Sequence, residues 1–299
     1  MNYPGLSKYI LMTIDVEDWF QVENLRSAYP VERWNSCDIR VESSTMELLD
    51  LLDRHNVRAT FFVLGWIAER CGQLVRSICE RGHEIASHGY CHQLCFGQSE
   101  DKIRDDLLRS KDLLEDLTGR EVMGYRAPSF SITNEVVRLL GELGYAYDSS
   151  YNNFSANRRH GRPRSLSEKS EGMFSYENGV IELPISNLQA WRCTIPWGGG
   201  GYFRFWPSKL FHWGVNQILG ADGRYVFYCH PWEIDAGQPR ARELRWHHRF
   251  RHYLNLSETL KRLDNFLLRF NCQAKITCED YLKNRINGSP ARLLQVTKE

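Results

Sequence analysis

The stretch His83-Glu84-Ile85-Ala86-Ser87-His88-Gly89-Tyr90-Cys91-His92 decides how the rest of the chain is interpreted. Its first half is typical of a short buried strand, and two histidines, His88 and His92, follow where that strand ends. On a helical turn, a spacing of four residues places both imidazoles on one face, so that both can reach one metal ion. An isolated pair with this spacing is more often two surface histidines in a loop.

An acidic cluster elsewhere in the chain favours the metal site. The sequence Asp15-Val16-Glu17-Asp18 follows an apolar run from Tyr9 to Ile14 that predicts a strand. Two histidines and one carboxylate supply three protein ligands, and a catalytic metal site keeps a further position open for water. The two motifs together predict a metal site where two strands end.

Composition bounds the class of protein. The chain has 299 residues, of which 42% are hydrophobic, and 38 Lys and Arg residues balance 37 Asp and Glu residues. This gives no electrostatic case for binding nucleic acid or an acidic membrane.

The nine cysteines form no spaced framework, which predicts reduced thiols and a cytoplasmic protein. Cys91 and Cys95, which flank His92, are interpreted as small apolar residues. The run at 9–14 is too short for a signal-peptide core or a membrane span.

Strand and helix patterns alternate through most of the chain. Strands are predicted at 9–14, 58–65, 84–87, 122–125, 145–147, 180–184, 225–229 and 273–277, and helices at 43–55, 67–81, 98–117, 133–143, 207–219 and 257–270. Such alternation predicts a parallel sheet covered by helices, and seven or eight strands favour a closed or partly closed barrel. We assign residues 1–285 to one domain and 286–299 to a tail. The Arg- and Ser-rich segment 152–175 is interpreted as a solvated loop rather than an anion site.

Ionisable residues recur where the predicted strands end. In a parallel α/β barrel these ends converge on one mouth, where active sites lie. The residues are Asp15, Glu17 and Asp18 after the first strand, His88 and His92 after the third, Arg126 after the fourth, Asp148 after the fifth and His230 after a late strand. Together they favour metal-assisted hydrolysis, with a carboxylate as general base, a histidine as general acid and an arginine that orients the base.

This set of residues resembles the NodB-homology polysaccharide deacetylases, carbohydrate esterase family four, from about residue 9 to about residue 283. The closest resemblance is to the branch found in exosortase-associated (PEP-CTERM) exopolysaccharide clusters. The resemblance implies a distorted (β/α) barrel of about seven parallel strands. It also implies metal-dependent removal of N-acetyl groups from amino sugars. Zinc is the default divalent metal for two histidines and a carboxylate.

The resemblance assigns roles to the metal and base residues. The family motif Thr-Phe-Asp-Asp-Gly corresponds to Thr13-Ile14-Asp15-Val16-Glu17-Asp18-Trp19, which makes Asp15 the base. This sequence departs from the motif at the metal carboxylate. Strand alternation places Glu17 on the same side as Asp15, and Asp18 is the alternative ligand if the chain has already turned. His88 and His92 match the histidine ligands, and His83 is interpreted as structural.

Further motifs imply the rest of the site. Arg126-Ala127-Pro128-Ser129 stands where the family has Arg-Pro-Pro-Tyr-Gly, so that Arg126 would orient Asp15 and the Ser129 N–H would serve the oxyanion. Tyr228-Cys229-His230 makes His230 the general acid. The segment Gly200–Arg204 fits a sugar-binding rim and an ordinary tight turn equally well. The predicted substrate-binding residues are Pro128, Ser129, Asp148, Tyr202, Arg204 and Trp232.

The expected substrate is an N-acetylated oligo- or polysaccharide or a lipid-linked or nucleotide-linked precursor, with peripheral association to a polysaccharide assembly complex. The main alternative is a cyclic amide or imide hydrolase, because related branches of the fold open rings. Aromatic segments around Trp191, Trp197, Trp206 and Trp232 favour a sugar cleft. A non-haem iron oxygenase would also use two histidines and a carboxylate, but the predicted alternation disagrees with its usual antiparallel fold. Joint retention of base, ligands, arginine and acid disfavours a metal-free binding protein.

Overall fold

The computed structural model describes residues 8–154, 156–157, 159–163, 167–170, 173–191, 193–241 and 245–287. Nearly all of the predicted tail and parts of the Arg- and Ser-rich segment lie outside these residues. The assignment of residues 1–285 to one domain stays a prediction. No helix in the described ranges combines the length and apolar character needed to cross a bilayer.

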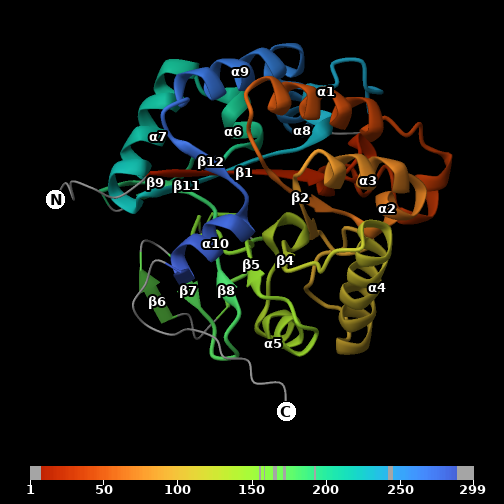
Figure 1. Cartoon of the computed structure of the whole chain (residues 1–299). Coiled ribbons are helices and arrows are strands. Elements are labelled where there is room, and N and C mark those ends of the chain that lie inside the picture. Colours follow the sequence, from red (N-terminus) through yellow and green to blue (C-terminus); the bar gives the residue numbers. More distant parts are fainter. Residues whose placement is uncertain are drawn as a thin grey trace.

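One curled sheet of ten strands organises the fold (Figure 1). Seven neighbouring strands run parallel in the order β11-β1-β2-β3-β4-β5-β8, and β12 pairs in parallel with the start of β1. Strands β7 and β6 extend the β8 edge in antiparallel pairing. The bounds are β1 Tyr9–Val16, β2 Thr60–Val63, β3 Glu84–Ser87, β4 Gly124–Tyr125, β5 Tyr147–Asp148, β6 Ser167–Ser170, β7 Met173–Ser175, β8 Ile181–Glu182, β11 Arg224–Cys229 and β12 Ala274–Ile276. The predicted distorted barrel is confirmed, and the barrel is incompletely closed.

The gap in the curl lies between β8 and β11. The chain after β8 crosses it without forming a strand of the sheet, and Ser186 Oγ accepts a hydrogen bond from the Val226 N–H at 2.8 Å. Gly199 forms an isolated parallel bridge with Tyr228 of β11. A Cβ at Gly199 would stand 1.9 Å from the Tyr228 carbonyl oxygen, so this close approach requires glycine. Part of the glycine run therefore serves backbone packing.

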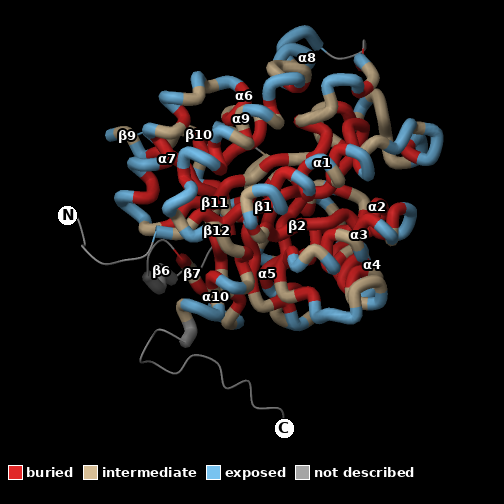
Figure 2. The backbone as a smooth tube through the Cα atoms, turned by 45° about the horizontal axis from the view of Figure 1, so that its top comes forward, coloured by how far each residue is buried: buried red, intermediate tan, exposed pale blue. Residues whose placement is uncertain are grey.

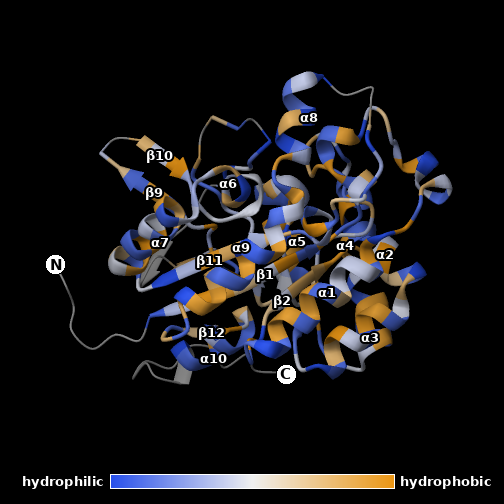
Figure 3. Ribbon diagram, turned by 90° about the horizontal axis from the view of Figure 1, so that it is seen from above, coloured by the Kyte–Doolittle hydropathy of each residue, from blue (hydrophilic) through white to orange (hydrophobic). Residues whose placement is uncertain are grey.

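The strands are apolar on both faces because both faces are covered (Figures 2 and 3). Seven of the eight residues of β1 are buried. Leu11, Phe62, Tyr147 and Val226 fill the inside of the curl, where they pack with residues of α10 (Cys278–Asn287). Helices cover the outside: α1 Val41–Arg54, α2 Gly65–Arg70, α3 Gly72–Glu80, α4 Glu100–Thr118, α5 Asn134–Glu142, α7 Ser208–Asp222 and α9 Leu256–Arg269.

Short elements surround the ends of the parallel strands. They are the helices α6 Gly200–Phe205 and α8 Trp246–Tyr253, the hairpin β9 Asn187–Ala190 and β10 Cys193–Pro196, and the 3-10 turns η1 Trp19–Gln21, η2 Glu23–Leu25, η3 Val31–Ser36, η4 Pro128–Phe130 and η5 Pro231–Ile234. The sequence predicted none of these as regular structure, nor the strands β6 and β7. The single helix predicted at 67–81 is also wrong, because Cys71 leaves helical geometry (φ −119°, ψ 42°) and separates α2 from α3.

The loop after β3, which carries His88 and His92, is fixed from two sides. The N–H groups of Gly65 and Trp66 in α2 donate to the carbonyls of Gly89 and Tyr90 at 2.9 and 3.0 Å. From α4, the Asp106 carboxylate accepts hydrogen bonds from the N–H groups of Tyr90 at 2.8 Å and Cys91 at 3.2 Å. The two helices therefore determine where the histidines lie.

We predict that Asp106→Ala lowers the free energy of unfolding by about 2–3 kcal/mol, because buried N–H groups lose a charged acceptor. Asp105→Ala, which removes the neighbouring exposed carboxylate of the same helix, should change it by less than about 0.5 kcal/mol. Urea unfolding of the two variants and the wild type measures the difference. Equal stabilities for the two variants would contradict the role given to Asp106.

Candidate metal centre and catalytic site

Arg126 and Asp15 form a buried ion pair at the centre of the site. Asp15 lies near the end of β1, and the fully buried Arg126 follows β4. Arg126 Nη1 donates to Asp15 Oδ1 at 2.6 Å and to Thr13 Oγ1 at 2.8 Å. Its Nε and Nη2 donate to the carbonyl and hydroxyl oxygens of Ser149 at 3.0 and 2.9 Å. These contacts fix the orientation of the Asp15 carboxylate.

Glu17, His88 and His92 form a buried cluster with metal-ligand geometry, in which one donor atom from each lies within 4.8 Å of the other two. His88 Nδ1 lies 2.7 Å from the carbonyl oxygen of Arg126. A carbonyl only accepts, so His88 Nδ1 carries the hydrogen and its Nε2 presents a lone pair. His92 Nε2 lies 2.9 Å from Glu17 Oε2. The donor set fits a divalent cation such as zinc.

The electrostatics of this cluster suit a cation. Burial lowers the pKa of His88 to about 4, so its imidazole is neutral at physiological pH. Burial alone would raise the pKa of Glu17, but the neighbouring His92 and His230 lower it well below its ordinary value. Neutral imidazole and ionised carboxylate are the forms that bind metal ions.

Asp18, the alternative carboxylate ligand, lies outside this cluster. Its Oδ2 accepts hydrogen bonds from the N–H groups of Arg40 at 2.7 Å and Val41 at 2.9 Å, at the start of α1, and its Oδ1 accepts one from Trp19 at 2.8 Å. Both oxygens are therefore occupied in anchoring η1 and α1. The structure favours Glu17 over Asp18 as the ligand, because Asp18 lies outside the cluster of Glu17, His88 and His92.

His230 faces both carboxylates from the end of β11. Its Nε2 lies 3.8 Å from Asp15 Oδ2 and 3.5 Å from Glu17 Oε1, and its Nδ1 lies 2.5 Å from Glu233 Oε1. Burial lowers the pKa of His230, but the charges of Glu17 and Glu233 outweigh it and raise the pKa to about 9. The imidazolium can therefore donate a proton at neutral pH.

Arg204 and Trp232, predicted to bind substrate, support other site residues although they border the cavity. Arg204 Nε donates to Glu233 Oε2 at 2.7 Å, behind His230. Trp232 Nε1 donates to Glu17 Oε1 at 3.1 Å, and its ring stacks between His230 and His252. Arg204 is thus paired with Glu233 behind His230, and the Trp232 N–H is bonded to Glu17.

The other predicted substrate residues divide into two groups. Ser129, in the left-handed conformation (φ 51°), and Tyr202 line the cavity. Asp148 and Pro128 are buried behind it. Asp148 accepts a hydrogen bond from the Ser150 hydroxyl, whose oxygen accepts one from the Ala127 N–H at 2.8 Å. Asp148 therefore supports the segment after Arg126.

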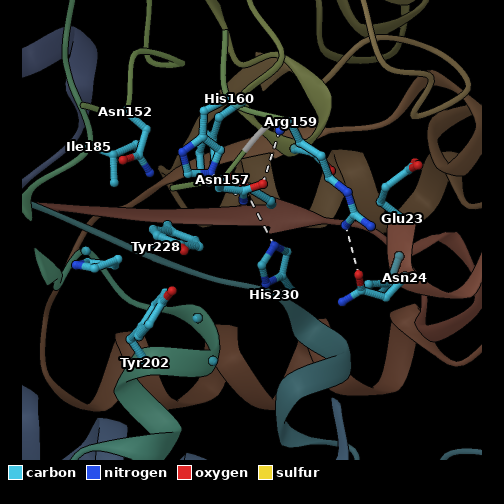
Figure 4. A pocket seen from close by; sticks show the side chains of 18 of the residues that line it. Glu23, Asn24, Asn152, Asn157, Arg159, His160, Ile185, Tyr202, Tyr228 and His230 are labelled. Carbon is cyan, nitrogen blue, oxygen red and sulfur yellow. Dashed lines mark hydrogen bonds and ion pairs between the residues drawn. The ribbon is translucent and has the colours of Figure 1, made fainter. Parts of the chain in front are cut away.

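The cavity above these residues has a volume of about 490 Å³. Figure 4 shows Tyr202 and Tyr228 on one side of His230, and Asn24 and Arg159 on the other. The sequence analysis gave no site role to several residues at or near the cavity: Asn24, Asn157, Arg159, His160, Tyr228, Glu233 and Arg251. Only Glu233 had a readable signal, because it lies three residues after His230 in His-Pro-Trp-Glu.

Two family profiles match the chain. The polysaccharide deacetylase profile matches residues 34–147, and a domain of unknown function, DUF3473, matches residues 149–277. A peptidoglycan deacetylase of Helicobacter pylori is 34% identical over 110 residues, 36% of this chain and 38% of the relative. A peptidoglycan-N-acetylglucosamine deacetylase of Bacillus cereus is 37% identical over 101 residues, 34% of this chain and 37% of the relative. The chain thus aligns with well under half the length of these relatives.

Solved structures share the fold along the whole chain. A crystal structure from Mycobacterium smegmatis, assigned to the polysaccharide deacetylases, has a TM-score of 0.63 at 22% identity and covers 100% of this chain and 98% of that one. An allantoinase structure has a TM-score of 0.60 at 15% identity, with coverage of 97% and 94%. The second likeness shows that the fold also occurs outside the deacetylases. Residues 34–147 therefore form a polysaccharide deacetylase region, which a DUF3473 region follows at residues 149–277.

Proposed function

We propose that this chain is a metal-dependent hydrolase that removes N-acetyl groups from amino sugars of an exopolysaccharide or its precursor. The observation that carries the proposal is the meeting of three groups at one cavity: the Asp15 carboxylate, the cluster of Glu17, His88 and His92, and the His230 imidazolium. Glu17, His88 and His92 would hold the ion, for which we propose zinc. A bound divalent ion supplies Lewis acidity and a water of lowered pKa.

The side chains have complementary roles in this proposal. Asp15 accepts a proton from the water that attacks the acetyl carbonyl carbon, and Arg126 keeps the carboxylate aimed at that water. The new carbon–oxygen bond forms as negative charge gathers on the carbonyl oxygen, to which we assign the Ser129 N–H as a donor. His230 then gives its Nε2 proton to the amine nitrogen as the carbon–nitrogen bond breaks. The products are acetate and a free amino sugar.

Glu233 and Arg204 position the proposed acid. The short contact between Glu233 Oε1 and His230 Nδ1 fixes the ring so that Nε2 faces the two carboxylates, and Arg204 holds the other oxygen of Glu233. Because Trp232 also stacks on the His230 ring, the imidazole is restrained in plane and in rotation. Such restraint lowers the entropic cost of reaching the geometry for proton transfer.

The finer substrate and location are part of the proposal. The aromatic rings of Tyr202 and Tyr228, together with amide side chains, suit a sugar. The proposal includes nucleotide-linked or lipid-linked precursors as substrates. It also includes a peripheral contact with a polysaccharide assembly complex. All nine cysteines are free of disulfides, and five of them are buried, which supports a reducing compartment such as the cytoplasm.

Acetate release tests the reaction class. We expect acetate from N-acetylglucosamine oligomers or from lipid-linked or nucleotide precursors, lost after chelation and restored by adding zinc. Acetate that continues unchanged in the chelated protein would contradict the metal dependence. Ring opening of a cyclic amide or imide, with no acetate from any sugar, would contradict the deacetylase proposal. The site would then catalyse the alternative hydrolysis with the same residues.

We predict that Asp15→Asn lowers kcat by at least about 100-fold, because general-base catalysis is lost. Bound metal should stay at the wild-type stoichiometry, since Asp15 lies outside the ligand cluster. Asp101→Asn, an exposed change of the same kind in α4, serves as the control. A wild-type rate for Asp15→Asn would remove this residue from the role of base.

The double variant His88→Ala, His92→Ala should lose the metal and remain folded, because Asp106, Gly65 and Trp66 still hold the loop through its backbone. Metal content by elemental analysis and far-UV circular dichroism measure the two outcomes. His247→Ala, on the exposed face of α8, is the matched control. Retention of metal at full stoichiometry by the folded double variant would place the metal site elsewhere.

A further inference from the structure

We propose that the cavity selects an N-acetylated sugar that carries an acidic group, a carboxylate or a phosphate, which Arg159 and Arg251 bind. This inference rests on the proposed function, since it names the substrate class of the same site. It comes from the charges that border the cavity outside the catalytic centre.

The carboxylates around the cavity each have a positively charged or ionisable partner. Four acidic residues border the cavity. Their partners are Arg126 for Asp15, His92 for Glu17, Arg26 for Glu23 and Arg204 for Glu233. Three of these acids are thus paired with an arginine, and the fourth, Glu17, belongs to the proposed metal-ligand cluster.

Arg159 and Arg251 also border the cavity, and neither forms an ion pair with a carboxylate of the described residues. Arg159 Nη1 donates to Asn24 Oδ1 at 2.8 Å. The Arg251 guanidinium lies 5.2 Å from the centre of the Tyr202 ring. Both partners are uncharged, so they orient the guanidinium groups without neutralising them. Two formal positive charges are thus left at the cavity.

The charges of the two arginines also affect the pKa values of two histidines at the cavity. His160 and His248 line the same cavity. Burial is the main cause that lowers the pKa of each, and both Arg159 and Arg251 lower it further, in the case of His160 to about 4. Both arginines therefore lie near enough to both rings to act on them, which agrees with their position at the same cavity.

The two arginines approach from different parts of the chain. Arg159 lies in the described residues 159–163, next to Asn157 and His160, which overlie the site in Figure 4. Arg251 is an exposed residue of α8 that borders the cavity. A guanidinium presents a planar fork of N–H donors that matches a carboxylate or a phosphate in two-point contact. A neutral glycan would gain little from such groups, whereas an acidic one would bind and also be drawn in by the field.

Matched substrates that differ in one acidic group test the inference. The probes are N-acetylglucosamine, its 1-phosphate and its uronic acid, each as a ligand and as a substrate. For the double variant Arg159→Gln, Arg251→Gln we expect KM and the dissociation constant for the acidic probes to rise about 10- to 100-fold. Values for the neutral sugar should stay unchanged. Arg249→Gln, an exposed arginine of α8 that does not line the cavity, is the control.

The two acidic probes separate the sources of the negative charge. A larger loss for the 1-phosphate assigns the arginines to a phosphate, and a larger loss for the uronic acid assigns them to a sugar carboxylate. An equal effect of the double variant on the neutral and acidic sugars, or no effect on either, would overturn the inference. Circular dichroism of the double variant guards against misfolding as the cause of a general loss.

Binding to chelated protein separates this inference from the proposed reaction. If no sugar releases acetate but the acidic probes bind and lose affinity in the double variant, the anion site stands and the deacetylase assignment fails. If acetate is released equally from neutral and acidic sugars by the wild type and the double variant, the reaction stands and the anion site fails.

Discussion

The buried guanidinium of Arg126 is the contact on which the site depends. It joins β1 to the chain after β5, because it donates to Thr13 and Asp15 on one side and to Ser149 on the other. Its own carbonyl accepts from His88 Nδ1 and so sets the tautomer of a metal ligand. Its charge also lies over the Phe62 ring inside the curl, 4.1 Å from the ring centre. One residue thus fixes the base, one ligand and the packing beneath both.

Around that contact, buried charges are arranged in linked pairs. Glu233 holds His230 with one oxygen and meets Arg204 with the other, while Trp232 donates to Glu17 and stacks on His230. A buried charge without a partner costs several kcal/mol, so breaking one such pair disturbs its neighbours. The unpaired arginines at the cavity stand out against this arrangement. Within the described residues, their contacts across the cavity are with uncharged side chains, and this is the region to which we assign the acidic group of the substrate.

The sequence could predict the parts of the site that depend on strand geometry, but not those that depend on contacts between distant segments. Residues that follow parallel strands converge by geometry, so Asp15, His88 and His230 could be placed together from strand patterns alone. The choice between Glu17 and Asp18 could not, because it depends on Asp18 meeting the start of α1, more than twenty residues away.

Features that depend on packing between distant segments were also beyond the sequence. Arg204 looked like a rim residue, but Glu233 and the carbonyls of His252 and Leu254 surround its guanidinium. Helix α8, which brings Arg251 to the cavity, has no strong periodic pattern and was missed. The exosortase-associated branch stays a prediction, since the comparisons show a polysaccharide deacetylase region and leave the branch open.

The most direct test of the central claim is to locate the metal ion. Crystals grown with zinc and measured at the zinc absorption edge should show one anomalous peak, about 2.0–2.2 Å from a nitrogen of His88, a nitrogen of His92 and an oxygen of Glu17. Asp15 should remain on Arg126, and Asp18 on the start of α1. A single fully occupied peak coordinated by Asp18, or by residues outside the cavity, would contradict the account.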